Sequence, residues 1–303
     1  MSDYFVIDGG ISLKGEVFPG GNKNAALPAM AAALLTEEPV TLRNMPDIQD
    51  VETMGRLLEN LGVDVQRLDA RTWQLQASEI RGLEPEAIAG TNHPSGLDDT
   101  SGLFRSIRGS ILIAGPLLTR QGYFMIPAPG GDVIGRRRVD THFLAFQALG
   151  ADVEVVDGFF RVQTALSTGD GGLEGTDILL DEVSVTGTEN AIMAAVLAKG
   201  TTIIRNAASE PHVQDLCQML NAMGAQVAGA GTNTLVIQGV DRLHGTDFTI
   251  GTDHIEVGSY IALAAATGGE LLIRNAVPHH LRMVRSVFRR LGVEIEVQDG
   301  DPD

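Results

Sequence analysis

Apolar and polar positions divide the chain into units of one recurring pattern. Residues 24–35 read NAALPAMAAALL, an alanine-rich stretch that favours a helix, and residues 40–44 read VTLRN, a β-branched run that favours a strand. After a proline-containing turn, an amphipathic helix ends at Gly62, where a left-handed C-terminal residue is expected, and another strand follows. The pattern predicts the order helix, strand, helix, strand.

The same order recurs along the chain. A second copy starts at Asn190, with TIIRN at 202–206 and a helix ending at Gly224; a third starts at Tyr260, and a diverged fourth covers 106–155. One explanation is that all βαβ sequences look somewhat alike. The return of Arg-Asn at a strand end, with Leu-Gly or Met-Gly 17 or 18 residues later, favours true repeats. Helices with one apolar face must cover a sheet, so the repeats predict an α/β fold.

Composition narrows the class of protein. The chain has 303 residues, of which 44% are hydrophobic, enough for one large or two ordinary domains. Its net charge of -17 argues against a general nucleic-acid binder. The N-terminus lacks a basic segment followed by an apolar core, and no run of about 18 apolar residues is present, so we expect a cytoplasmic protein without a membrane partner. Cys217 is expected to be a buried thiol without a chemical role.

The basic residues are mostly arginines and gather in one region. Only three lysines accompany nineteen arginines, and arginine binds carboxylate and phosphate oxygens through two parallel hydrogen bonds. Residues 101–139 contain a single acid, Asp132, and six arginines: Arg105, Arg108, Arg120, Arg136, Arg137 and Arg138. This excess predicts a compact anion pocket. For Arg120 and Arg136 a solvated surface is an equal alternative, whereas the apolar surroundings of Arg108 disfavour exposure.

Two turns add to the expected anion site. Lys23 lies in PGGNKNAALP, a glycine-rich turn that leads into a helix, so backbone N–H groups and an ammonium can bind one anion together. The turn SVTGTEN at 184–190 occupies the equivalent point of the second copy. The sequence shows no metal-ligand spacing, Walker loop, GxGxxG or GxSxG motif, so no metal and no cofactor are expected.

Four stretches together point to a family: GNKNAALPAMAAALLTEEPVTLRN, PGGDVIGRRRVDTH, VSVTGTENAIMAAVLAKGTTIIRNAASEPHVQDL and DHIEVGSYIALAAA. The chain resembles the UDP-N-acetylglucosamine 1-carboxyvinyltransferases, which are enolpyruvyl transferases. The resemblance implies an inside-out α/β barrel built from βαβαββ repeats. Residues 22–247 would form a complete three-repeat domain, and residues 1–21 with 248–303 one repeat of a second domain. We expect the first 21 residues to share a sheet with GVEIEV at 292–297.

The resemblance also implies roles for individual residues. Lys23 and Asn24 match the pair that contacts phosphoenolpyruvate and the reacting centre, and Arg108 and Arg137 match anion-binding arginines. The nucleotide sugar would be held by Arg137, Arg138, Val139, Asp140 and Thr141. Its diphosphate would lie against the backbone of Val183, Ser184, Val185 and Thr186.

Asp132 stands where most members of that family have a cysteine. It would donate a proton to C3 of phosphoenolpyruvate, although a free aspartate has a pKa of about 3.9 and nearby arginines lower it, so this role requires desolvation. The alternative is a solvated loop carboxylate without a proton role. Because a carboxylate is a poor nucleophile, we expect resistance to the epoxide fosfomycin, which alkylates the cysteine. Gln49 stands where the family commonly has a basic residue, which weakens one anion contact.

The activity implied is enolpyruvyl transfer from phosphoenolpyruvate to the 3-hydroxyl of UDP-N-acetylglucosamine, which opens peptidoglycan synthesis. These two small molecules are the expected partners, and the protein is expected to be a monomer. Because the chain stops at Asp303 after one repeat of the second domain, a fragment or a non-catalytic nucleotide-sugar binder is an alternative. A further alternative is the related 3-phosphoshikimate 1-carboxyvinyltransferase, which lacks the glycine-flanked acid loop.

Overall fold

The computed structural model describes residue 4 and residues 6–81, 97–131, 138–165 and 172–298, without the side chains of 97–100. These residues form two compact units. One comprises residues 23–251, and the other combines residues 1–22 with 252–303. Asp132, Arg136 and Arg137 lie outside the described residues.

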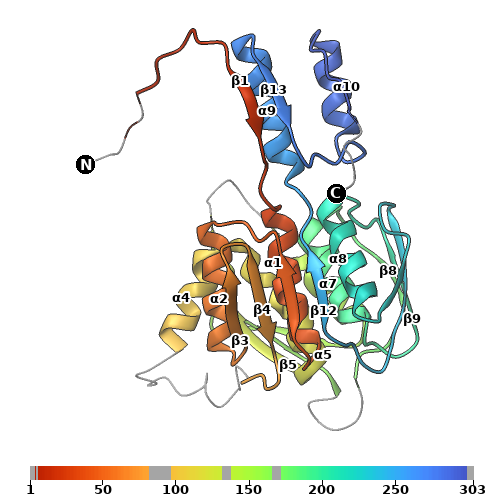
Figure 1. Ribbon diagram of the computed structural model, residues 1–303. Coiled ribbons are helices and arrows are strands. Elements are labelled where there is room, and N and C mark those ends of the chain that lie inside the picture. The colour runs from red at the N-terminus through yellow and green to blue at the C-terminus, as the bar shows by residue number, and fades with distance from the viewer. Residues whose placement is uncertain (1–3, 5, 82–96, 132–137, 166–171, 299–303) are drawn as a thin grey trace. The chain divides into compact units, whose positions relative to one another are not determined.

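The unit of residues 23–251 runs through three similar passages, labelled in Figure 1. The first contains α1 (Lys23–Ala32), the 3-10 turn η1 (Ala33–Leu35), β2 (Val40–Arg43), α2 (Gln49–Asn60), β3 (Asp64–Asp69) and β4 (Thr72–Gln76). The second contains α4 (Leu97–Ser106), η2 (Arg108–Ile113), α5 (Ala114–Gln121), β5 (Tyr123–Pro127), α6 (Asp140–Ala148), β6 (Asp152–Val156) and β7 (Phe159–Gln163). The third contains β8 (Asp177–Leu179), α7 (Val185–Ala195), β9 (Thr201–Arg205), α8 (Pro211–Ala222), β10 (Gln226–Ala228), β11 (Thr234–Gln238) and β12 (Thr246–Thr249).

Each passage builds one small sheet around an antiparallel hairpin. The strand orders are β12-β2-β4-β3, β5-β7-β6 and β10-β11-β9-β8. In two of the sheets a further strand is added in parallel, β12 beside β2 and β8 beside β9. The last strand of the unit therefore returns to the sheet of the first passage and closes the unit.

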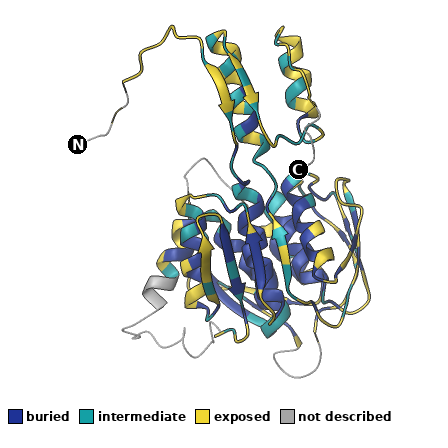
Figure 2. Cartoon of the chain, in the orientation of Figure 1, coloured by how far each residue is buried: buried dark blue, intermediate teal, exposed yellow. Residues whose placement is uncertain are grey.

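Helices fill the centre of this unit. Every residue of α1 from Ala25 to Ala32 is buried, and so is every residue of α7 from Gly187 to Ala195. Figure 2 shows this burial in dark blue, with exposed residues on the outer strands such as β3. Alanine suits these helices because a small side chain lets neighbouring helices approach closely while keeping high helix propensity. The α/β fold expected from the repeats is confirmed.

The unit of residues 1–22 and 252–303 contains β1 (Lys14–Val17), α9 (His254–Thr267), β13 (Glu270–Ile273) and α10 (Arg282–Arg290). β1 lies parallel to β13, with Lys14 opposite Glu270. The pairing of the N-terminal segment with the later chain is thus confirmed. The prediction that this segment pairs with residues 292–297 is wrong, because those residues form no strand. β13 follows α9 directly, as β2 follows α1 and η1 in the first repeat. Each of these strands pairs with a parallel strand, β13 with β1 and β2 with β12.

The Arg-Asn pairs have a structural role. Each asparagine adopts a left-handed φ, between 53° and 59°, at the end of its strand: Asn44, Asn206 and Asn275. Each preceding arginine forms an ion pair with an acid on the neighbouring parallel strand: Arg43 with Asp247, Arg205 with Asp177, and Arg274 with Glu16. The expected left-handed glycines after the amphipathic helices are confirmed at Gly62 and Gly224. Among the described residues, no helix is both long and apolar enough to cross a bilayer.

Candidate functional site

The N-terminus of α7 presents backbone N–H donors that no described residue binds. Ser184 caps the helix, and its hydroxyl accepts a hydrogen bond from the Gly187 N–H at 3.1 Å. Within the described chain, the N–H groups of Val185 and Thr186 have no hydrogen-bond partner. A Cβ on Gly187 would lie 3.0 Å from Thr141 Cγ2, so glycine lets α6 approach this end of α7. Such a helix terminus favours an anion because its N–H groups and dipole point outward.

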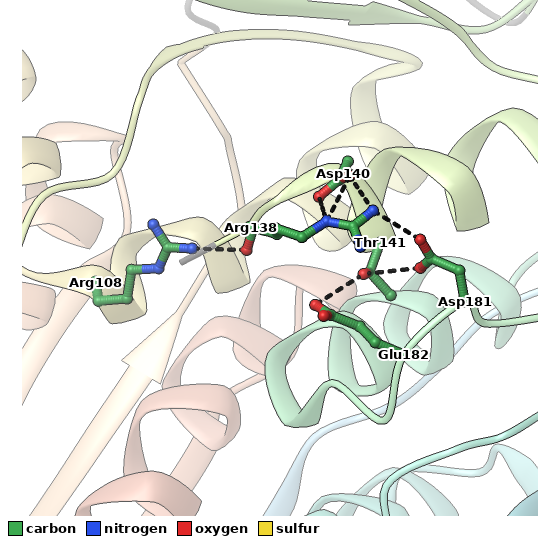
Figure 3. A network of polar contacts seen from close by, with 6 residues as sticks. All are labelled: Arg108, Arg138, Asp140, Thr141, Asp181 and Glu182. Atoms are coloured by element: carbon green, nitrogen blue, oxygen red, sulfur yellow. Dashed lines mark hydrogen bonds and ion pairs between the residues drawn. The ribbon is translucent and has the colours of Figure 1, made fainter. Parts of the chain in front are cut away.

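Arg138 lies beside this terminus in a network of charges (Figure 3). Its guanidinium donates to both carboxylate oxygens of Asp140 and, at 2.8 Å, to Asp181. Hydrogen bonds and charge from Asp140, followed by those from Asp181, raise the pKa of Arg138. Arg108 donates to the Arg138 carbonyl at 2.8 Å, so the two arginines are held next to each other.

Two acids also approach Thr141, the second residue of α6. Its hydroxyl oxygen lies 3.2 Å from Asp181 Oδ1 and 3.2 Å from Glu182 Oε1. A hydroxyl carries one hydrogen, so it donates to one of these carboxylates at a time. Arg108 and Arg138 bring two positive charges to this network and Asp140, Asp181 and Glu182 three negative ones. An anion at α7 must therefore gain most of its attraction from backbone N–H groups and from further cations.

The described residues on either side of the segment that contains Asp132 are held by the end of α4 and the start of η2. The N–H groups of Gly130 and Gly131 donate to the carbonyls of Phe104 and Arg105. A Cβ on Gly130 would lie 1.5 Å from the Arg105 carbonyl oxygen, and Gly131 has a φ of +90°. These contacts explain the two glycines before Asp132, because the backbone approaches Arg105 of α4 and Arg108 of η2 too closely for a side chain. At the other end, Arg108 binds the Arg138 carbonyl.

Lys23 lies at the first residue of α1, as its turn suggested. Its ammonium forms an ion pair with Asp50 of α2 at 3.0 Å, and the two side chains are 45% and 38% exposed. Lys23 retains two further N–H donors for a ligand.

The structure thus brings together Arg108, Arg138, Asp140, Thr141 and the turn Val183–Thr186, and it places Lys23 and Asn24 at the start of α1. Val139 is the N-cap residue of α6, and Val183 is 60% exposed. Arg120 lies elsewhere: its side chain is 18% exposed and donates to the Leu34 carbonyl at 2.9 Å. It supports the end of η1, so the solvated reading of Arg120 is wrong.

Three acids and one buried histidine were not expected from the sequence. Asp50, Asp181 and Glu182 contact the predicted cations or Thr141, and His142 is 1% exposed behind Thr186. The sequence stretches VDTH and DEVS did not indicate these contacts, because the interacting residues come from separate elements. Their chemistry follows only from packing.

Residues 7–302 match the family model described as EPSP synthase (3-phosphoshikimate 1-carboxyvinyltransferase). The chain belongs to the EPSP synthase family. Curated relatives named UDP-N-acetylglucosamine 1-carboxyvinyltransferase include those of Treponema denticola, 49% identical over 95% of this chain, and Treponema pallidum, 48% identical over 97%. The relative from Bradyrhizobium diazoefficiens is 48% identical over 98% of the chain. The chain spans 63% to 64% of the length of these three relatives.

Solved structures share the EPSP synthase fold at lower identity. The enolpyruvyl transferase NikO from Streptomyces tendae superposes with a TM-score of 0.75 and 23% identity, covering 96% of this chain and 65% of NikO. EPSP synthase from Acinetobacter baumannii gives a TM-score of 0.66 and 17% identity, covering 94% of this chain and 60% of that enzyme. At such identities the likeness concerns the fold alone.

Proposed function

We propose that this chain takes part in transfer of the enolpyruvyl group from phosphoenolpyruvate to the 3-hydroxyl of UDP-N-acetylglucosamine. The observation that carries the proposal is the 48% to 49% identity, over at least 95% of the chain, to curated enzymes named for this transfer. The sugar oxygen adds to C2, a proton adds to C3, and loss of a C3 proton with phosphate leaves the enolpyruvyl ether. The reaction opens peptidoglycan synthesis and would take place in the cytoplasm.

The geometry at α7 supports binding of the nucleotide sugar. Its diphosphate would accept hydrogen bonds from the N–H groups of Val185 and Thr186, with Ser184 and Val183 shaping the turn. Arg137, Arg138, Val139, Asp140 and Thr141 would hold the rest of the nucleotide. Because Arg138 is already paired with two carboxylates, we assign the main attraction to the backbone N–H groups and to Arg137, with Arg108 as a second anion-binding arginine.

Lys23 and Asn24 would bind phosphoenolpyruvate, whose several negative charges require more than one cation. Lys23 can do so without leaving Asp50, since a single ammonium has three donors. Asp132 would supply the proton to C3 once the substrates exclude water, which raises its pKa toward the working range. We further propose that residues 22–247 form one three-repeat domain, that residues 1–21 with 248–303 belong to a second, and that the protein is a monomer.

Separate calorimetric titrations with the two substrates, followed by a phosphate-release assay, test the proposal. Binding of both ligands with phosphate release supports transfer by this chain. Binding of UDP-N-acetylglucosamine without turnover supports the second candidate, a nucleotide-sugar-binding part of a longer enzyme. This candidate is considered because the chain spans only 63% to 64% of the length of these relatives. Absence of binding to UDP-N-acetylglucosamine would refute both.

The role of Asp132 is tested separately, by measuring turnover of this chain or, if the chain alone has no turnover, of a longer protein that contains it. Asp132→Ala should remove most turnover, and Asp132→Cys should restore sensitivity to fosfomycin, because a thiolate opens the epoxide readily. Turnover that survives Asp132→Ala from pH 5 to 9 would refute the role as proton donor.

A further inference from the structure

A chain of hydrogen bonds runs from the protein interior to the N-terminus of α7. It connects the backbone of Ile111 and Gly115 with the side chains of Asn190, His142 and Thr186. Asn190 is fully buried and His142 is 1% exposed, so water does not replace these partners. Thr186, at the end of the chain, is partly exposed.

The two backbone partners fix the orientation of the Asn190 amide. Its oxygen lies 2.8 Å from the Gly115 nitrogen, and its nitrogen lies 2.8 Å from the Ile111 carbonyl oxygen. A flipped amide would place an NH₂ against an N–H and an oxygen against a carbonyl, losing both hydrogen bonds inside the core. The NH₂ group therefore faces Ile111, and its second hydrogen points to His142 Nδ1, 2.8 Å away.

This orientation decides the tautomer of His142. Nδ1 accepts from Asn190 and carries no hydrogen, so a neutral ring has its hydrogen on Nε2. Burial, and secondly the positive charge of Arg108, lower the pKa of His142 to about 3, against a smaller opposing effect of Asp140. The ring is thus neutral at ordinary pH, and Nε2 donates to the Thr186 hydroxyl oxygen at 3.2 Å.

We infer that Asn190 and His142 act as positioning residues that turn the hydrogen of the Thr186 hydroxyl away from the ring, so that it donates to an oxygen of the bound diphosphate. Because the hydroxyl oxygen already accepts from His142, its own hydrogen is directed away from the ring. No other described group accepts it. The inference rests on the proposed function, since it names a third donor beside the N–H groups of Val185 and Thr186.

Such a donor distinguishes between ligands. A diphosphate oxygen accepts from these donors, whereas a ligand that presents only N–H or O–H groups at this point would leave their three hydrogens without an acceptor. Charge-assisted hydrogen bonds of this kind are stronger than neutral ones. The site therefore selects for the ionised phosphate part of a nucleotide sugar and contributes nothing to binding of a nucleoside.

The first experiment reads the tautomer directly in the unliganded chain. Proton–nitrogen correlation spectra of the histidine rings, with His142→Gln used to assign the signals, should show His142 neutral with its hydrogen on Nε2 from pH 5 to 9. Asn190→Asp places an acceptor where the NH₂ group stood and should move the hydrogen to Nδ1. A wild-type ring that is protonated on Nδ1, or charged in this range, would overturn the inference.

The second experiment measures binding by calorimetry, with UDP-N-acetylglucosamine and uridine as probes. Thr186→Val should weaken UDP-N-acetylglucosamine binding about 10- to 100-fold. Thr186→Ser should restore it, and uridine binding should not change. Thr202→Val is the matched control, because the Thr202 hydroxyl on β9 is buried and has no hydrogen-bond partner among the residues that the structure describes. Asn190→Asp should reproduce the loss while it keeps the Thr186 hydroxyl.

These results separate the inference from the proposed function. Wild-type protein that binds neither probe would refute the proposed function, while the spectra still decide the tautomer. Normal wild-type binding that Thr186→Val leaves unchanged would overturn the inference alone. Circular dichroism establishes that each variant is folded, and if Asn190→Asp does not fold, the valine and serine variants of Thr186 decide the result.

Discussion

Asp215 offers a sharp test of the electrostatics inside the larger unit. Its carboxylate lies on α8, is 9% exposed, and accepts a hydrogen bond from the Gly251 N–H at 3.2 Å. Burial raises the pKa of Asp215 from 3.8 to about 6, against the smaller lowering effect of the Gly251 hydrogen bond. Gly251 fits only because it lacks a side chain, since a Cβ there would lie 2.5 Å from Asp215 Oδ2.

The raised pKa sets the sign of the pH dependence. Between pH 3.8 and about 6 the folded protein holds a proton on Asp215 that the unfolded chain has released. The favourable contribution is complete below the unfolded pKa and is lost as the pH rises through the folded pKa. By pH 8 the ionised carboxylate lowers the free energy of unfolding by about 3 kcal/mol relative to acid pH.

Asp215→Asn removes this pH dependence while it keeps an oxygen for Gly251. Urea denaturation of both proteins at pH 4, 6 and 8 gives the difference in the free energy of unfolding at each pH. We expect this difference to shift in favour of the variant by about 2.5 kcal/mol between pH 4 and pH 8. Comparing the shift cancels any constant cost of the new NH₂ group. The contribution of Glu189 to the pH dependence also cancels, because burial raises the pKa of Glu189 in both proteins.

A shift below about 0.5 kcal/mol would refute the reasoning, because it would mean that Asp215 titrates alike in folded and unfolded chains. A shift of the opposite sign would mean that the folded protein stabilises the ionised form. In that case the Gly251 hydrogen bond would outweigh burial.

Three further outcomes are expected. Arg108→Ala should weaken UDP-N-acetylglucosamine binding by about 1.5 to 3 kcal/mol. Arg120→Ala should lower the melting temperature and leave binding nearly unchanged. Equal losses of binding in calorimetry would indicate a diffuse basic surface. Asn44→Ala should lower the free energy of unfolding, measured in urea, by about 1 to 2 kcal/mol. Alanine tolerates a φ of 56° poorly, and the substitution removes the hydrogen bond from the Asn44 side chain to the Ile250 carbonyl. An unchanged urea midpoint would contradict this. Burial raises the pKa of Cys217 to about 12, so a thiol reagent at pH 8 should label it only after unfolding, and equal labelling rates with and without urea would show that the thiol is accessible.

Local sequence determined the elements of this protein. The spacing of apolar residues, the left-handed glycines at Gly62 and Gly224, and the start of α1 at Lys23 all depend on residues within one or two turns. The resemblance of four stretches to a known family then added the architecture and a set of candidate residues. Neither source of information described which side chains would meet.

Tertiary structure decided the contacts that give the candidate site its chemistry. Asp181 pairs with Arg138 across 43 residues of sequence, and Asn190 meets Gly115 across 75 and His142 across 48. The pairing of β1 with β13 likewise joins segments about 250 residues apart. Such contacts leave no local signal, because hydrophobic spacing specifies which face of an element is buried but not which element covers it. The orientation of one buried amide, and with it the direction of the Thr186 hydroxyl, follows only once that packing is known.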